Sequence, residues 1–166
     1  MANEPTWEMR ISECPALVNG PLVYLCGTIT PNAIHRDWRD AAEWELADYG
    51  IGCLSPVRGK NPADWTPDGL EGKASVAYSN GGFVARDRRD VERCDALLLA
   101  FTKDMDPGRQ SLGTWCELGW ATAWNIPVVV WTDMPEIEKH PFIYRQAAKV
   151  CGTLDEALEY LEFLLG

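Results

Sequence analysis

Apolar residues gather in four short runs along the chain, and each run is followed by a glycine, a proline or a polar residue. The runs are four to six residues long, which is typical of strands that are buried on both faces. They predict strands at residues 22–26, 51–54, 96–101 and 126–131.

The segments between and after these runs carry helical signals. Helical spacing of apolar residues and helix-start residues predict helices at residues 37–49, 86–94 and 113–124. Asp37 is the candidate N-cap of the first helix. Thr153 and Glu156 have the spacing of a capping box and predict a final amphipathic helix.

Alternation of strands and helices is typical of an α/β fold with a parallel sheet covered on both faces. We therefore expect a Rossmann-like or flavodoxin-like three-layer sandwich with four or five mainly parallel strands, formed by one domain over residues 1–166. Residues 1–20 are expected to be an N-terminal extension. Ligands of such sheets bind beyond the carboxyl ends of the strands, so the loops there are where functional residues are expected.

One long segment without periodicity, residues 57–83, contains five glycines and two prolines. A loop of this length inside a compact domain is usually a functional lid or an insertion. Its aromatic residues Trp65, Tyr78 and Phe83 could close over a bound ligand, so we expect an active-site loop.

Composition narrows the function classes. The 166 residues are 46% hydrophobic and 24% charged, as in an ordinary globular protein. The net charge of −10 argues against non-specific nucleic-acid binding, although a local basic pocket for a small anion is compatible with it. No apolar run is long enough to span a bilayer, and no secretory signal pattern opens the sequence, so a cytoplasmic protein is expected.

The sequence lacks the residue patterns that several common kinds of site require. The six cysteines form no CxxC pair and only two histidines are present, so a zinc site lacks its usual spacing and the cysteines are expected to be buried thiols. Neither GxxxxGK[ST] nor GxGxxG occurs, and no Ser or Cys has a His at triad spacing.

Carboxylates at helix starts remain as candidate chemistry. Glu117 is expected in the first turn of the predicted helix 113–124, where exposed amides and the helix dipole would keep it ionised, as a nucleophile requires. Gly113 would let a ligand come close. Ordinary roles are also open: Glu117 could merely complement the dipole, Asp87 could cap its helix, and Asp90 could pair with Arg86 or Arg93.

Three segments in order resemble the nucleoside 2-deoxyribosyltransferase superfamily, which includes the 2′-deoxynucleoside 5′-monophosphate N-glycosidases and the CMP and hydroxymethyl-CMP hydrolases. They are Tyr24-Leu-Cys-Gly-Thr-Ile29, Asp87 placed eight residues before Asp95, and Ser111-Leu-Gly-Thr-x-x-Glu-Leu-Gly-x-Ala121. Together they cover about residues 22–130. The segments around Arg39 and 55–60 also look like those of phage-encoded relatives.

The resemblance implies that Glu117 attacks the anomeric carbon of a sugar and forms a covalent glycosyl-enzyme, by the logic of retaining glycosidases. Asp87 would assist protonation of the leaving base, and Tyr24 would orient Glu117. The candidate substrate-binding residues are Gly27, Thr28, Arg39, Arg58, Asp90, Ser111, Gly113 and Thr114. No metal or organic cofactor is implied.

Ser111 bears on the choice between nucleoside and nucleotide substrates. Superfamily members that act on unphosphorylated nucleosides tend to carry an acidic residue six positions before the nucleophile, whereas a serine there could donate to a phosphate. The monophosphate hydrolases, however, have an arginine where Thr30 stands. Arg39, Arg58 or Lys60 could supply that charge, or could be solvated surface groups.

The reaction type stays open between hydrolysis and transfer, because the glycosyl intermediate could be resolved by water or by a second free nucleobase. A non-catalytic nucleotide-sensing module is the competing class, since fold does not fix function, but it would need neither Glu117 nor Asp87. The resemblance further implies a homodimer or a larger homo-oligomer, with residues 133–145, expected to be a polar loop, as a candidate contact.

Overall fold

A computed structural model describes residues 20–29, 34–58, 82–105 and 111–166. The expectations for the N-terminal extension and for most of the 57–83 loop, with Lys60, Trp65 and Tyr78, lie outside the described residues, as does Thr30.

Five parallel strands form one sheet in the order β2-β1-β3-β4-β5. The strands are β1 (Leu22–Gly27), β2 (Gly52–Leu54), β3 (Ala96–Ala100), β4 (Val128–Trp131) and β5 (Ala147–Cys151). This confirms the predicted parallel α/β sheet, and its strand order is the flavodoxin-like one.

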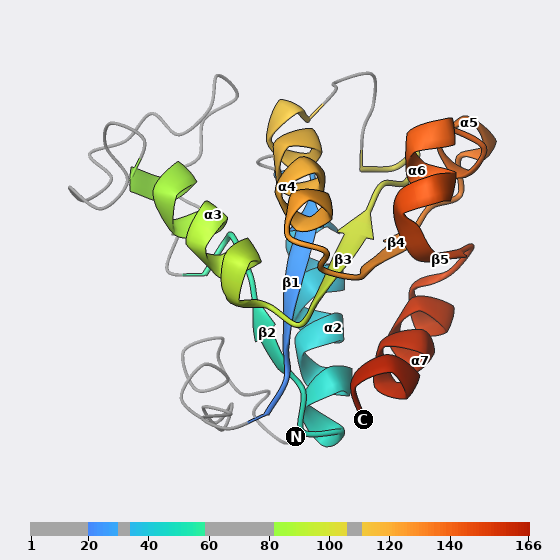
Figure 1. The fold of residues 1–166 in the computed structure, drawn as a ribbon. Coiled ribbons are helices and arrows are strands. Elements are labelled where there is room, and N and C mark those ends of the chain that lie inside the picture. The colour runs from blue at the N-terminus through green and yellow to red at the C-terminus, as the bar shows by residue number, and fades with distance from the viewer. Residues whose placement is uncertain (1–19, 30–33, 59–81, 106–110) are drawn as a thin grey trace.

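Helices cover both faces of the sheet (Figure 1). One face carries α3 (Gly82–Arg93) and α4 (Leu112–Ala123), which pack on each other and on β1. The opposite face carries α2 (Ile34–Asp48) and α7 (Leu154–Leu165). Among the described helices, none is long and apolar enough to cross a membrane.

The two faces of β1 serve two separate cores because side chains of a strand alternate. Val23 and Leu25 pack into the core beneath α2 and α7. Tyr24 and Cys26 point to the opposite core, beneath α3 and α4. Asp95 fixes the start of β1, because its Oδ2 accepts a 2.8 Å hydrogen bond from the backbone N–H of Leu22. Asp95 therefore has a structural role at the entrance of the strands.

Two helix starts differ from prediction. Helix α2 begins at Ile34, so Asp37 lies inside it and is not its N-cap. An aspartate is favoured both at the cap and in the first turn, where it complements the dipole, so residue type alone misplaces the boundary. Helix α3 begins at Gly82, four residues before the predicted start, and includes Phe83 from the predicted loop.

The expectation of a polar loop over residues 133–145 is wrong. The segment contains α5 (Pro135–Glu138) and α6 (Pro141–Gln146), each with a proline in its first turn, where the missing N–H costs nothing. The next residues form β5, an edge strand with two exposed positions and therefore no continuous apolar run to signal it.

Candidate active site

The side chain of Glu117 is the centre of a buried polar cluster between β1 and α4. Its Oε1 accepts a 2.7 Å hydrogen bond from the phenolic hydroxyl of Tyr24. Its Oε2 lies 3.0 Å from the Sγ of Cys26, which donates to it. Glu117 is 8% exposed, and Tyr24 and Cys26 are fully buried. Each carboxylate oxygen therefore has its own donor, and both donors come from the same face of one strand.

The start of α4 determines where Glu117 stands. Ser111 is the N-cap, and its Oγ accepts from the backbone N–H of Thr114 at 3.4 Å and from the hydroxyl of Thr114 at 2.8 Å. Glu117 is then the sixth residue of the helix, in its second turn. The prediction that it lies in the first turn is wrong, since the glycine taken as the first residue of the helix is its second.

Two hydrogen-bond donors on β1 favour the ionised form of Glu117. Burial raises the pKa of Glu117 above its usual range, while the hydrogen bonds from Cys26 and Tyr24 lower that pKa. Negative Asp87 raises it further, and positive Arg39 lowers it. Burial and the nearby carboxylate of Glu117 also raise the pKa of Tyr24 and of Cys26, so both side chains stay protonated donors.

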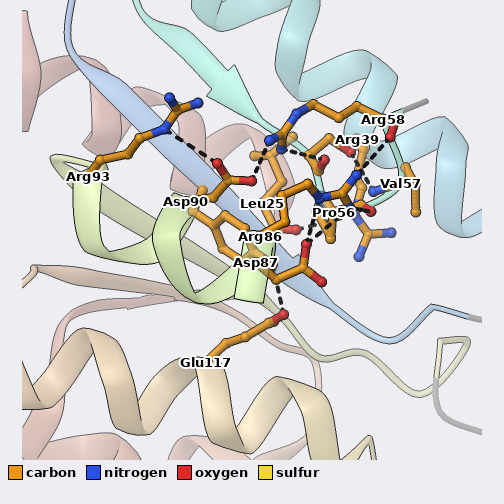
Figure 2. Close-up of polar contacts among 12 residues, drawn as sticks. Leu25, Arg39, Pro56, Val57, Arg58, Arg86, Asp87, Asp90, Arg93 and Glu117 are labelled. Atoms are coloured by element: carbon orange, nitrogen blue, oxygen red, sulfur yellow. Dashed lines mark hydrogen bonds and ion pairs between the residues drawn. The ribbon is translucent and has the colours of Figure 1, made fainter. Parts of the chain in front are cut away.

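Asp87 of α3 is the second carboxylate at this site. Figure 2 shows its side chain and that of Glu117 approaching from α3 and α4, close enough for the charge of Asp87 to act on Glu117. Asp87 is 6% exposed. Its Oδ1 accepts from Nε and Nη2 of Arg86 at 3.2 and 3.0 Å.

Arg86 also fixes the chain that follows β2. Its Nη2 donates to the carbonyl of Pro56 at 2.6 Å and its Nη1 to that of Arg58 at 3.3 Å (Figure 2). One guanidinium thus joins Asp87 to the segment after β2, and this uses the rigid set of donors that only arginine provides.

Asp90 lies one turn after Asp87 and pairs with two arginines. Its Oδ2 is 2.5 Å from Nη2 of Arg58, and its Oδ1 is 3.4 Å from Nε of Arg93. Of the two sequence-predicted partners, Arg93 is found and Arg86 is not, because Arg86 pairs with Asp87. Arg58 and Asp90 therefore form a tie between α3 and the segment after β2.

Arg39 supports the carboxyl end of β1 from the other face of the sheet. It is fully buried, and its Nη2 and Nε donate to the carbonyls of Gly27 and Leu25 at 2.9 and 3.3 Å. Burial lowers the pKa of Arg39 to about 10, so it is a cation at neutral pH. The interpretation as a solvated surface arginine is wrong for this residue.

Gly27 ends β1 at a point where an added Cβ would be crowded. A Cβ here would lie 3.0 Å from the carbonyl oxygen of Ala100, 3.2 Å from the Trp38 ring and 3.3 Å from Arg39. Thr28 follows, 4% exposed, and its Oγ1 has no hydrogen-bond partner among the described residues. Gly113 is exposed on α4, with open space beside it.

The fold thus brings Tyr24, Glu117 and Asp87 together at β1, as the sequence predicts. From β1 the chain adds β2 on one side of the sheet and then β3, β4 and β5 on the other, so the strand order reverses between β1 and β3. Such switch points are where flavodoxin-like sheets bind ligands. Within the described ranges, no group of three His, Cys, Asp or Glu side chains could hold a metal ion.

Sequence reasoning missed two residues of this site, Cys26 and Arg86. Cys26 was signalled by its position two residues after Tyr24 on a strand, which puts both side chains on one face. The partner of Arg86 was ambiguous, because four arginines and two aspartates lie within eight residues of α3.

Solved structures with this fold include two enzymes. A 2-deoxyribosyltransferase from the psychrotolerant bacterium Bacillus psychrosaccharolyticus matches with a TM-score of 0.62 and 17% identity, over 87% of this chain and 96% of that one. The CMP N-glycosidase BcmB of Clostridium botulinum matches with a TM-score of 0.53 and 16% identity, over 87% and 99%. A conserved protein of Enterococcus faecalis V583 has a TM-score of 0.62 and 17% identity, over 89% and 100%.

At these identities the likeness shows a shared fold. No curated protein sequence matches the chain. The family model for nucleoside 2-deoxyribosyltransferase matches residues 23–151, a segment that contains β1, the two carboxylates and the start of α4. This match covers most of the chain and includes the whole buried cluster, so the protein belongs to the nucleoside 2-deoxyribosyltransferase family.

Proposed function

We propose that the protein cleaves the N-glycosidic bond of (2′-deoxy)nucleosides, and preferentially of their 5′-monophosphates, through a covalent glycosyl-Glu117 intermediate. The observation that carries this proposal is the buried Glu117 carboxylate, with one donor on each oxygen and the Asp87 carboxylate near enough to raise its pKa. Glycosyl transfer with retention requires two such groups, one to attack and one to handle the proton of the leaving group.

In the first step a carboxylate oxygen of Glu117 attacks the anomeric carbon of the sugar. A carbon–oxygen ester bond forms and the bond between that carbon and the base nitrogen breaks. The electron pair of the broken bond stays on the base, which takes up a proton that Asp87 has received from the solvent, and Asp87 is left as a carboxylate.

In the second step the ester is opened. A water oxygen, or a ring nitrogen of a second base, attacks the anomeric carbon, and the ester electron pair returns to the Glu117 carboxylate. The proton of the incoming group passes to Asp87. Water gives an N-glycosidase and a second base gives a deoxyribosyltransferase.

Preference for a 5′-phosphate is supported by the start of α4. The Ser111 oxygen accepts in both of its hydrogen bonds with Thr114, which is compatible with its own proton being donated to a ligand. The amides of the first turn and the positive end of the helix dipole also favour an anion. A carboxylate at this position would instead repel a phosphate.

Chromatography of reaction mixtures tests the proposal. The purified protein is incubated with ribo- and deoxynucleosides and with their 5′-monophosphates, with and without a second free base. Base released from monophosphates alone supports the hydrolase, whereas a new nucleoside or nucleotide formed only with the second base supports the transferase.

Glu117→Gln is the matched variant, because it keeps the size of the side chain and removes the nucleophile. Glu159→Gln, on the exposed side of α7, is the control and should keep wild-type turnover. Wild-type protein that binds nucleotides without releasing base would overturn the proposal in favour of a nucleotide-sensing module.

A further inference from the structure

The two oxygens of Glu117 are held by donors of unequal strength. The phenol of Tyr24 contacts Oε1 at 2.7 Å, and the thiol of Cys26 contacts Oε2 at 3.0 Å. A thiol is a weak hydrogen-bond donor, whereas a phenol is a strong one. The negative charge that remains available for bond formation is therefore greater on Oε2.

We propose that Cys26 is a positioning residue that orients the Glu117 carboxylate and presents Oε2 as the oxygen that attacks the anomeric carbon. This proposal rests on the proposed function and deepens it. Nothing in the family match or in the structural neighbours assigns a role to Cys26.

The location of Cys26 suits this role. The residue is fully buried in β1, which is paired on both sides, with β2 and β3, so its backbone has little freedom. Its Sγ also lies 3.8 Å from the carbonyl of Thr114, one turn before Glu117 on α4. The thiol thus contacts both the carboxylate and the helix that carries it.

The chemistry favours the weaker donor on the attacking oxygen. When Oε2 forms its bond to the anomeric carbon, charge leaves Oε2 and the weak thiol contact is given up at small cost. Oε1 becomes the carbonyl oxygen of the ester and keeps its hydrogen bond from Tyr24. The electron pair of the broken glycosidic bond leaves with the base, as in the first step above.

The ionisable side chains that act most on the Glu117 carboxylate are Tyr24 and Cys26 on β1 and Asp87 on α3. Arg39 on α2 acts on it from the opposite face of the sheet. Loss of the Cys26 donor raises the pKa of Glu117, because that hydrogen bond favours the ionised form. The acid limb of a pH–rate profile should therefore respond to Cys26.

Two variants separate the effect of the Cys26 hydrogen bond from the effect of the packing of its side chain. Cys26→Ala removes the donor, and Cys26→Ser replaces it with a stronger one of similar size. With a nucleoside 5′-monophosphate that the wild type cleaves, Cys26→Ala should lower kcat about 3- to 10-fold at neutral pH and leave KM within about twofold. Its acid limb should move to higher pH, so the loss is smallest in alkaline buffer.

Cys26→Ser should lower kcat without moving the acid limb to higher pH, because its hydroxyl still stabilises the carboxylate. Cys151→Ala is the matched control: it removes a buried thiol from β5, far along the sheet from Glu117, and should leave kcat and the profile unchanged. An acid limb that stays in place in Cys26→Ala, or moves equally in both variants, overturns the proposal.

An infrared measurement tests the contact without turnover. The S–H stretching band of Cys26, identified by its loss in Cys26→Ala, should shift to higher frequency in Glu117→Gln, because an amide is a weaker acceptor than a carboxylate. An unshifted band in an active enzyme overturns the role of Cys26 alone. A shifted band in an enzyme that releases no base from any nucleotide overturns the proposed function, and with it the role of Cys26 in the reaction.

Discussion

The phenolic hydroxyl of Tyr24 donates a 2.7 Å hydrogen bond to Oε1 of Glu117, across 93 positions of sequence. Tyr24 lies on β1 and Glu117 on α4. The two side chains meet because α4 packs on β1 in the folded protein. A hydrogen bond to a buried charge is worth more than a neutral one, since the charge has lost its water. Tyr24 therefore contributes both the position and the ionisation of Glu117.

Tyr24→Phe should lower kcat about 10- to 100-fold with little change in KM. Without the phenol the pKa of Glu117 rises, because the hydrogen bond favours the ionised form, so the acid limb of the kcat profile moves to higher pH. Steady-state kinetics across the pH range check this. A variant with wild-type kcat at every pH would show that Tyr24 does not act on Glu117.

Glu117→Gln should stabilise the protein at neutral pH. Burial raises the pKa of Glu117 in the folded state, so its contribution to stability is complete below the unfolded pKa and is lost as the pH rises through the folded pKa. Glutamine carries no charge to bury. Calorimetry should find a higher Tm for the variant at pH 7, by roughly 2–4 °C for each kcal/mol, and a difference that narrows toward pH 4. A larger difference at pH 4 than at pH 7 would contradict this sign.

Arg86→Lys should lower both activity and stability. A lysine ammonium cannot contact Asp87 and the carbonyls of Pro56 and Arg58 at once, so we expect a loss of about 1–2 kcal/mol and a kcat about 3- to 10-fold lower. Arg89→Lys, on the exposed side of the same helix, should change neither. Urea unfolding and initial rates measure the two effects, and equal behaviour of both variants would rule out the bridging role.

Gly27→Ala should destabilise the protein by about 1–3 kcal/mol, because its Cβ would press on the Ala100 carbonyl and on two buried side chains that cannot easily move. Gly119→Ala is the control, since a Cβ there meets open space inside α4 and alanine favours helix. Thermal unfolding should place the two variants on opposite sides of the wild type. A Gly27→Ala variant as stable as the wild type would show that the end of β1 shifts easily to make room for the Cβ.

The α/β fold could be predicted from the sequence because its strands are buried on both faces and read as unbroken apolar runs. β5 could not be located, since an edge strand with exposed positions leaves only a weak pattern. Helices α5 and α6 each begin with a proline. Because prolines are also common in loops, the sequence alone does not distinguish a helix start from a loop here.

The clustering of Glu117, Asp87 and Tyr24 could be predicted because a motif named each of these residues. The hydrogen-bond and ion-pair partners of side chains were harder to predict, because pairing depends on how helices and strands approach one another. Arg39 illustrates this: arginines are mostly exposed, and only the close packing at Gly27 shows that this one supports two carbonyls from inside the protein.

The most direct test of the account is the mass of the intact protein during turnover. Wild-type protein quenched in acid with a slowly resolved nucleotide substrate should carry one glycosyl group, and peptide mapping should locate it on Glu117. Glu117→Gln should show the mass of the unmodified chain under the same conditions. A glycosyl group on another residue, or turnover by Glu117→Gln at the wild-type rate, would contradict the assignment of Glu117 as the nucleophile.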